Sequence, residues 1–333
     1  MRNFSKIRIN RIKGWCFTII VTFTSLLDHP NATAILEKVL SINDLKKHYG
    51  SIRAVDGISL EVQKGSVFGL LGPNGSGKTT TLSILLDVVK SDSGSYQWFG
   101  KPPSKESRKR IGAILEQPVF YPYLTAYTNL RIVADIKDAD PQEIDKVLSI
   151  TGLSERRFSR FRTYSYGMKQ RLAIASALLG KPDVLIFDEP TNGLDPGGIA
   201  EIRLLINELS QEGYTILLAS HLLDEVQKTC SHVAVLNKGK VLYQGTVEEV
   251  LYAGNTVEIA STGNKELEIT VNESGLAVNV TADGPLLVVN LREGVSIEQF
   301  HKYLVERGII LNHLAMRKFS LEDKFLELLR EKS

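Results

Sequence analysis

The sequence predicts an α/β fold in which short buried strands alternate with helices. Three apolar runs carry this prediction, namely Val67 to Leu71, Val184 to Phe187 and Thr215 to Ala219. Each run is short and continuously apolar, which is typical of a strand in a parallel sheet that is covered on both faces. Stretches with apolar residues at helical spacing lie between them, including Thr80 to Val89 and Leu172 to Leu179. A glycine-rich loop follows the first run and indicates where the chemistry lies.

This loop matches the pattern G-x-x-x-x-G-K-T, and it lies between a strand and a helix, as the pattern requires. Backbone N–H groups of such a loop surround the phosphates of a nucleotide, and the helix start adds a favourable dipole. Lys78 can reach the β- and γ-phosphates, and the Thr79 hydroxyl can bind Mg²⁺. A glycine-rich turn without a ligand is the alternative. The predicted nucleotide contacts are Gly72, Pro73, Asn74, Gly75, Ser76, Gly77, Lys78, Thr79 and Thr80.

Two carboxylates, Asp188 and Glu189, follow the apolar run that ends at Phe187. Open α/β sheets bind their ligands at the edge formed by the carboxyl ends of the strands. We predict that Asp188 holds Mg²⁺, directly or through water, and that Glu189 polarises the attacking water. A polar turn is the alternative for an isolated Asp-Glu-Pro sequence, but the phosphate loop in the same chain favours hydrolysis.

A third pattern, Tyr-Ser-Tyr-Gly-Met from Tyr164 to Met168, precedes a helical run. Its serine and glycine can contact an anion, although alone they are more typical of an ordinary helix cap. With this pattern the chain resembles the ATP-binding cassette (ABC) ATPases, whose signature is usually Leu-Ser-Gly-Gly-Gln. Ser165 and Gly167 match the signature, whereas Tyr166 replaces its first glycine. The variant resembles the signature of ATPases from antibiotic-exporting systems, including the bacitracin type.

Four further positions extend the resemblance, which covers roughly residues 38 to 250. Tyr49 resembles the aromatic residue that stacks on adenine, and Gln117 resembles the glutamine that senses Mg²⁺ and the attacking water. Gly193 to Asp195 resembles the loop that crosses to the other cassette, and His221 resembles the histidine that contacts the γ-phosphate. Each residue alone is as readily structural, and their order along the chain favours the functional interpretation.

The resemblance implies a P-loop NTPase cassette with a mixed sheet core, an antiparallel edge sheet and a helical subdomain. It implies ATP and Mg²⁺ as cofactors, with Glu189, His221 and Gln117 as catalytic residues and Thr79, Gln117 and Asp188 around the metal. Two cassettes face head to tail in this family, so we expect a homodimer in which Ser165 and Gly167 close over the nucleotide of the other copy.

The implied function is that of an ATP-hydrolysing subunit that couples cassette closure to transport, with export favoured. No segment after residue 40 is apolar for long enough to span a bilayer, so the permease is expected to be a separate chain. Its coupling segments should dock near Gln117 to Leu130, which places the chain on the cytoplasmic face of the cell membrane. The alternatives are a soluble ABC ATPase acting on ribosomes or DNA, and a regulatory nucleotide binder. Glu189 argues against the binder.

Composition narrows these possibilities. The chain has 333 residues and a formal net charge of +2, which argues against a large nucleic-acid face. Its two cysteines, Cys16 and Cys230, do not make a disulfide framework, and its six histidines show no metal-ligand spacing. We therefore expect neither nucleic acid nor a structural metal as a partner.

Residues 1–37 are predicted to be an N-terminal extension. Basic residues are followed by the apolar run Trp15 to Leu27 and by the small residues Asn31 to Ala34, which together mimic a secretory signal. The apolar run is shorter than the roughly 20 residues that span a bilayer. We favour an upstream extension from a start codon assigned too early, with a membrane-surface tail and a signal peptide as alternatives.

Residues 38–253 are predicted to form the ATP-binding domain, with an antiparallel edge sheet from Val39 to Glu61. A separate α+β domain is expected over residues 254–333, with a packing or dimerising role. Its expected elements are strands at Thr256 to Ile259, Leu267 to Val271 and Pro285 to Leu291, and helices at Ile297 to Glu306 and Leu321 to Leu329.

Overall fold

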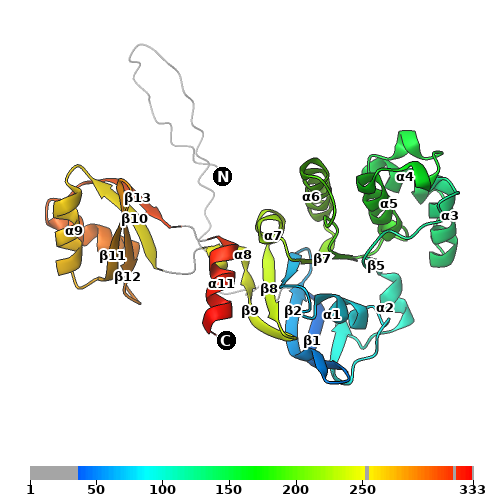
Figure 1. Ribbon diagram of the computed structural model, residues 1–333, viewed down its shortest axis with the longest axis horizontal. Coiled ribbons are helices and arrows are strands. Elements are labelled where there is room, and N and C mark those ends of the chain that lie inside the picture. Colours follow the sequence, from blue (N-terminus) through cyan, green and yellow to red (C-terminus); the bar gives the residue numbers. More distant parts are fainter. Residues whose placement is uncertain (1–36, 252–254, 318–319, 332–333) are drawn as a thin grey trace, which may run out of the picture. The chain divides into compact units, whose positions relative to one another are not determined.

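The computed structural model describes residues 37–251, 255–317 and 320–331 (Figure 1). Expectations about the N-terminal extension therefore lie outside the described residues, apart from Glu37. In the described part of the chain, no helix combines the length and the apolar character needed to cross a membrane.

A six-stranded sheet forms the centre of the ATP-binding region. Its strand order is β5-β6-β7-β3-β8-β9, in which all neighbouring strands are parallel except the hairpin of β8 and β9. The three apolar runs form β3, β6 and β7, as predicted. The strands are β3 (Val67–Leu71), β5 (Ile111–Ile114), β6 (Val184–Asp188), β7 (Thr215–Ser220), β8 (His232–Asn237) and β9 (Lys240–Thr246).

The predicted antiparallel edge sheet is also present, in the order β2-β1-β4. One hydrophobic core joins it to the central sheet and to helix α1 (Lys78–Leu85). Trp98 is fully buried in this core, and its indole nitrogen donates to the Leu85 carbonyl at 3.1 Å. This bond fixes the end of the helix that begins at the phosphate loop. The strands are β1 (Lys38–Tyr49), β2 (Ile52–Gln63) and β4 (Ser93–Trp98).

Residues 120–180 are mainly helical, as predicted. They form a second hydrophobic core with residues of the central sheet. Lys137 Nζ donates to the carbonyl oxygens of Ser176, Ala177 and Leu179, which ties α3 to the end of α5. The helices of the ATP-binding region are α2 (Lys105–Lys109), α3 (Ala126–Lys137), α4 (Glu143–Ile150), η1 (Ser154–Arg156), η2 (Phe161–Thr163), α5 (Tyr166–Leu178), α6 (Pro196–Gln211), α7 (Leu223–Thr229) and α8 (Val247–Leu251).

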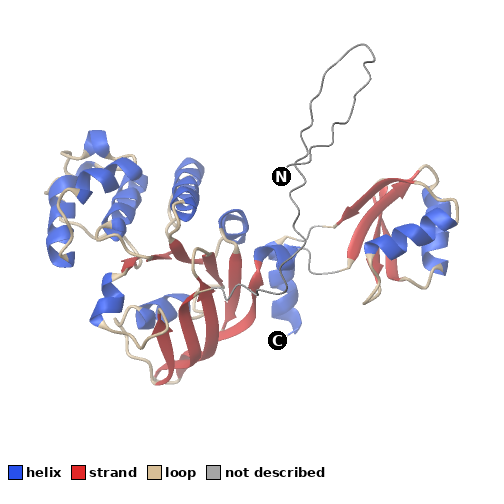
Figure 2. Cartoon of the chain, turned by 180° about the vertical axis from the view of Figure 1, so that it is seen from behind, coloured by secondary structure: helices blue, strands red, loops and turns tan. Residues whose placement is uncertain are grey.

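A second, smaller sheet with its own hydrophobic core lies in the C-terminal part of the chain (Figure 2). Its strand order, β11-β12-β10-β13, and its alternation of strands and helices match the split βαβ arrangement of ferredoxin-like units. The elements are β10 (Thr256–Ser261), α9 (Asn264–Glu273), β11 (Ala277–Asp283), β12 (Leu286–Leu291), α10 (Ile297–Glu306) and β13 (Leu311–Met316).

The strand predicted from Leu267 to Val271 is wrong, because these residues lie in helix α9. Leu267 and Val271 are buried one helical turn apart, whereas Ile269 between them is 59% exposed. The apolar residues therefore follow the helical period, although the short run fits a period of two equally well. Strands β11 and β13 were not predicted. The sequence of β13 shows no clear alternation, whereas that of β11 alternates although none of its side chains is buried.

The last helix, α11 (Leu321–Glu331), packs against α7 and α8. Leu321 is buried in the core of the ATP-binding region, and its backbone N–H donates to Gln227 Oε1 at 3.1 Å.

Candidate nucleotide site

The phosphate loop joins β3 to α1, and its glycines fix its course. Gly77 has a φ of 104°, and a Cβ at this position would clash with the carbonyl oxygen of Ala54. A Cβ at Gly72 would clash with the carbonyl oxygen of Leu236 in the same way. The loop therefore adopts a conformation that these two positions allow only to glycine.

Lys78, Glu189 and His221 form one charged cluster beside this loop. Lys78 Nζ donates to the Gly72 carbonyl at 2.7 Å and lies 3.4 Å from Glu189 Oε1. The other oxygen of Glu189, Oε2, lies 2.8 Å from His221 Nδ1. Glu189 has a φ of 50°, a left-handed conformation that is uncommon for a residue with a side chain and is concentrated at functional sites. The cluster thus holds the predicted base between two groups that can carry positive charge.

Asp188 is buried at the end of β6, and its Oδ1 atom has no hydrogen-bond partner. Burial raises the pKa of Asp188 above its usual value, although a hydrogen bond with the Thr79 side chain favours the ionised form. An unpartnered buried oxygen typically costs about 1–3 kcal/mol. Such an oxygen beside a hydroxyl fits the preference of Mg²⁺ for oxygen ligands.

The structure brings the other predicted metal and water contacts into one place. An open cavity of about 530 Å³ is lined by Thr79, Gln117, Asp188, Glu189, Asn192 and Tyr166. The residues come from α1, from the loop after β5, from the end of β6 and the turn that follows it, and from the start of α5. Sequence reasoning did not single out Asn192 or Tyr166 as part of this cavity. The departure of Tyr166 from the usual signature glycine was a signal that could have found it.

Ser165 and Gly167 lie elsewhere. They line a second cavity together with Asp195, and no phosphate-loop residue lines that cavity. Ser165 Oγ accepts a hydrogen bond from the Met168 backbone N–H at 3.3 Å, so the serine is also the cap of α5.

Tyr49 lies at the end of β1 with 48% of its surface exposed, and Lys47 Nζ lies 5.6 Å from its ring centre. Its ring is thus open to stacking.

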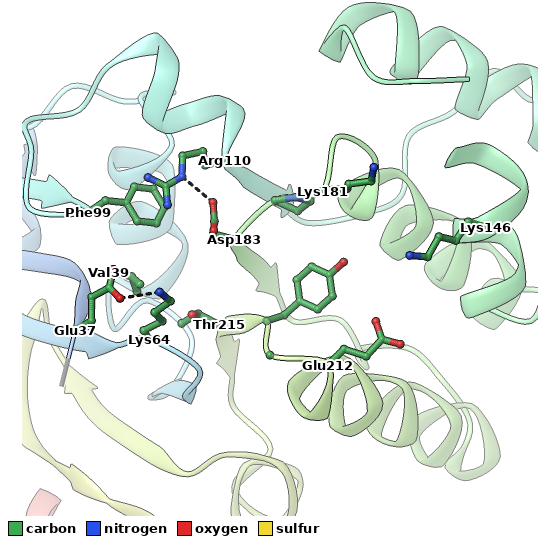
Figure 3. Close-up of a pocket in the computed structure, with 13 residues that line it drawn as sticks. Glu37, Val39, Lys64, Phe99, Arg110, Lys146, Lys181, Asp183, Glu212 and Thr215 are labelled. Carbon is green, nitrogen blue, oxygen red and sulfur yellow. Dashed lines mark hydrogen bonds and ion pairs between the residues drawn. The ribbon is translucent and has the colours of Figure 1, made fainter. Parts of the chain in front are cut away.

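A further cavity, of about 370 Å³, lies at the opposite edge of the central sheet, where the parallel strands begin (Figure 3). Its charged groups largely pair with one another. Arg110 Nε lies 2.7 Å from Asp183 Oδ2, and the guanidinium carbon of Arg110 lies 3.6 Å from the centre of the Phe99 ring. Lys64 Nζ lies 2.6 Å from Glu37 Oε2. No residue predicted to bind nucleotide lines this cavity.

A phosphate loop between a parallel strand and a helix, an antiparallel edge sheet and a helical subdomain together define a P-loop ATP-binding cassette. Solved cassettes have the same fold. One is an ATP-binding cassette of an ABC transporter in its ADP conformation, with a TM-score of 0.58 and 25% identity over 64% of this chain and 94% of that chain. Another is cbiO1 of Clostridium perfringens, part of the transporter complex cbiONQ, with a TM-score of 0.58 and 30% identity over 73% of this chain and 96% of that chain.

The family model described as ABC transporter matches residues 55–192. The bacitracin transport ATP-binding protein BcrA of Bacillus licheniformis is 38% identical over 88% of this chain and 98% of its own length. The lantibiotic transport ATP-binding protein SrtF of Streptococcus pyogenes is 38% identical over 62% of this chain and 90% of its own length. The chain belongs to the ABC transporter family, as an ATP-binding subunit that hydrolyses ATP and works with a separate permease. This result favours the transporter prediction over a soluble ABC ATPase.

Proposed function

We propose that two copies of this chain pair head to tail and hydrolyse ATP to drive export by the permease. The phosphate loop of one copy holds ATP, and Ser165 and Gly167 of the other copy close over it. The observation that carries this proposal is the cluster of Lys78, Glu189 and His221 beside a buried Asp188. The separate cavity around Ser165 supports the need for a second copy.

The contacts of Lys78 suggest how ATP activates the site. Lys78 Nζ donates to the Gly72 carbonyl and lies 3.4 Å from Glu189 Oε1. A triphosphate in the loop offers Lys78 a stronger, charge-assisted partner. Glu189 then loses one cation but keeps its contact with His221, so the carboxylate stays oriented while it accepts a proton from the attacking water. ATP binding thus converts Glu189 from an ion-pair partner into a base.

The remaining predicted residues have roles that fit their positions. Asp188, Thr79 and Gln117 would hold Mg²⁺, with Asp188 contributing the unpartnered oxygen. When bound, this cation supplies charge neutralisation at the phosphates. His221 would hold the γ-phosphate side, and the exposed ring of Tyr49 would stack on adenine.

Two relatives are named for the transport of bacitracin and of lantibiotics, and we extend this kind of cargo to the present chain. The cargo would be an antibiotic-like peptide or lipid-like molecule that leaves the cell. The permease would dock between Gln117 and Leu130, where Val119, Tyr121 and Tyr123 are exposed and offer an apolar surface. Docking there would place the chain at the cytoplasmic face of the cell membrane, with membrane contact through the permease.

The test of this function is Glu189→Gln, which keeps the size of the side chain and removes its basic oxygen. We expect ATP affinity to stay within about twofold while steady-state hydrolysis falls by roughly 100-fold or more, as with loss of a general base. Nucleotide titration and phosphate release measure the two quantities. Hydrolysis at the wild-type rate would remove Glu189 from the chemistry.

The pairing of two copies has its own test. Glu189→Gln should elute as a dimer in size-exclusion chromatography with Mg-ATP, because the closed nucleotide is not consumed. Adding Ser165→Arg places a bulky cation where the hydroxyl should meet the γ-phosphate of the other copy. We expect this double variant to bind ATP and to remain monomeric. An equal ATP-dependent dimer in both variants would contradict the proposed role of Ser165.

A further inference from the structure

Tyr166 links the two cavities of the nucleotide site. Among the described residues, it alone lines both the cavity with Asp188 and Glu189 and the cavity with Ser165 and Gly167. Its side chain is 37% exposed, and no hydrogen bond to another described residue fixes its hydroxyl. The contacts of Tyr166 with the rest of the chain are therefore made by the carbon atoms of its ring.

The ring packs on the turn that follows Glu189. A Cβ at Gly193 would lie 3.4 Å from Tyr166 Cε1, so the ring covers the bare backbone of this glycine. Gly193 has a φ of 78°, which places it in the left-handed region. Next to it, Leu194 Cδ2 lies 3.7 Å from the position that a Cβ of Gly167 would take. The start of α5 and this turn are thus packed together within one chain.

The turn from Asn192 to Asp195 is also connected to Glu189, the predicted base. The Asn192 backbone N–H donates to the Glu189 carbonyl at 3.1 Å. At the other end, Asp195 Oδ1 accepts from the Gly198 backbone N–H at 3.0 Å and caps α6. The turn is thus held at both ends, and its position is tied to Glu189 by the Asn192 hydrogen bond and by the short run of backbone between the two residues.

We infer that Tyr166 is a positioning residue that holds the turn from Asn192 to Asp195, and with it Glu189, against the start of α5 in the same chain. The inference rests on the proposed function for the role of Glu189. The usual signature has a glycine in place of Tyr166, and a glycine has no ring to cover the turn.

The first experiment replaces Tyr166 in the full chain by glycine or by phenylalanine. Tyr166→Gly should lower kcat by roughly 10- to 100-fold, as expected for a misplaced catalytic group, with KM for ATP and nucleotide affinity within about twofold of wild type. Tyr166→Phe keeps the ring and should restore kcat to within about twofold. Wild-type kcat in the glycine variant, or failure of phenylalanine to restore it, would overturn the inference.

A second experiment tests the contact itself through a double-mutant cycle. Gly193→Ala strains a left-handed backbone and places a Cβ in ordinary van der Waals contact with the ring, 3.4 Å from Tyr166 Cε1. In the Tyr166→Gly background this contact is absent, so the fractional loss of kcat caused by Gly193→Ala should differ from the loss in the wild-type background. Equal fractional losses in the two backgrounds would mean that ring and turn are not coupled.

Gly213→Ala is the matched control, because Gly213 has a φ of 93° and no atom within 4 Å of its Cβ position. It should lower the melting temperature and leave kcat unchanged, and a loss of kcat here would show that strain alone explains Gly193→Ala. Glu189→Gln is assayed alongside. Normal hydrolysis by Glu189→Gln would refute the proposed function, whereas an inactive Glu189→Gln with a fully active Tyr166→Gly would refute this inference alone.

Discussion

The central sheet carries a cavity at each edge, and the two differ in how their charged groups are satisfied. At the edge where the parallel strands end, Asp188 Oδ1 and Ser76 Oγ are buried without a partner, and Lys78 is shared between a carbonyl and Glu189. At the edge where they begin, Arg110 and Lys64 each have a carboxylate within 3 Å (Figure 3). Among the residues that line these two cavities, Asp188 alone has a buried side-chain oxygen without a partner, and this difference distinguishes the ligand site.

The largest effect on ATP binding should come from Lys78, at the edge where the parallel strands end. Lys78→Ala removes a charged hydrogen-bond donor to the phosphates, and we expect ATP affinity to fall roughly 10- to 100-fold. The matched variant at the other edge is Lys64→Ala, which breaks an exposed ion pair and should leave ATP affinity unchanged. Equilibrium titration with a fluorescent nucleotide measures both. Equal losses would erase the distinction between the two edges.

An intermediate effect should come from Asp188→Asn, which removes a buried charge but keeps an oxygen for Thr79. Because burial raises the pKa of Asp188, the folded chain holds this proton more tightly than the unfolded chain. The stability that protonation gives is present at low pH and is lost as the pH rises through the raised pKa. At neutral pH without metal, Asp188→Asn should therefore melt a few degrees higher than wild type.

The same variant should gain less from Mg-ATP than wild type does, because it lacks the carboxylate that we assign to the metal. Scanning calorimetry in EDTA and in Mg-ATP, over a range of pH, gives both quantities. A lower melting temperature of Asp188→Asn in EDTA would mean that the buried carboxylate stabilises the empty site.

The smallest effect should come from Arg110→Ala. The residue is half exposed and combines an ion pair with Asp183 and a contact with the Phe99 ring, which together contribute about 1 kcal/mol. We expect the melting temperature to fall by about 1–2 °C and kcat and KM to stay unchanged. A selective loss of ATPase activity in a variant with normal melting would assign a function to this second cavity.

Sequence patterns predicted the parts of the molecule that local chemistry determines. The phosphate loop and strands such as Val67–Leu71 have continuous apolar or glycine-rich patterns that leave few alternatives. The region from Leu267 to Val271 was mistaken for a strand because five residues fit both periods, and only packing against the small sheet decides between them. The role that we assign to Tyr166 lay beyond sequence reasoning, since its contact with Gly193 depends on how α5 meets a distant turn.

The position of β3 has a consequence for how the chain is made. This strand is the first of the central sheet to be synthesised, yet both of its neighbours, β7 and β8, come from much later in the sequence. The bond from the Gly65 N–H to Thr215 Oγ1 spans 150 residues. At a translation rate of about 5–20 residues per second, β3 leaves the ribosome roughly 7–30 s before β7 can pair with it. During this time its apolar side chains have no partner strands to cover them, which exposes the nascent chain to aggregation.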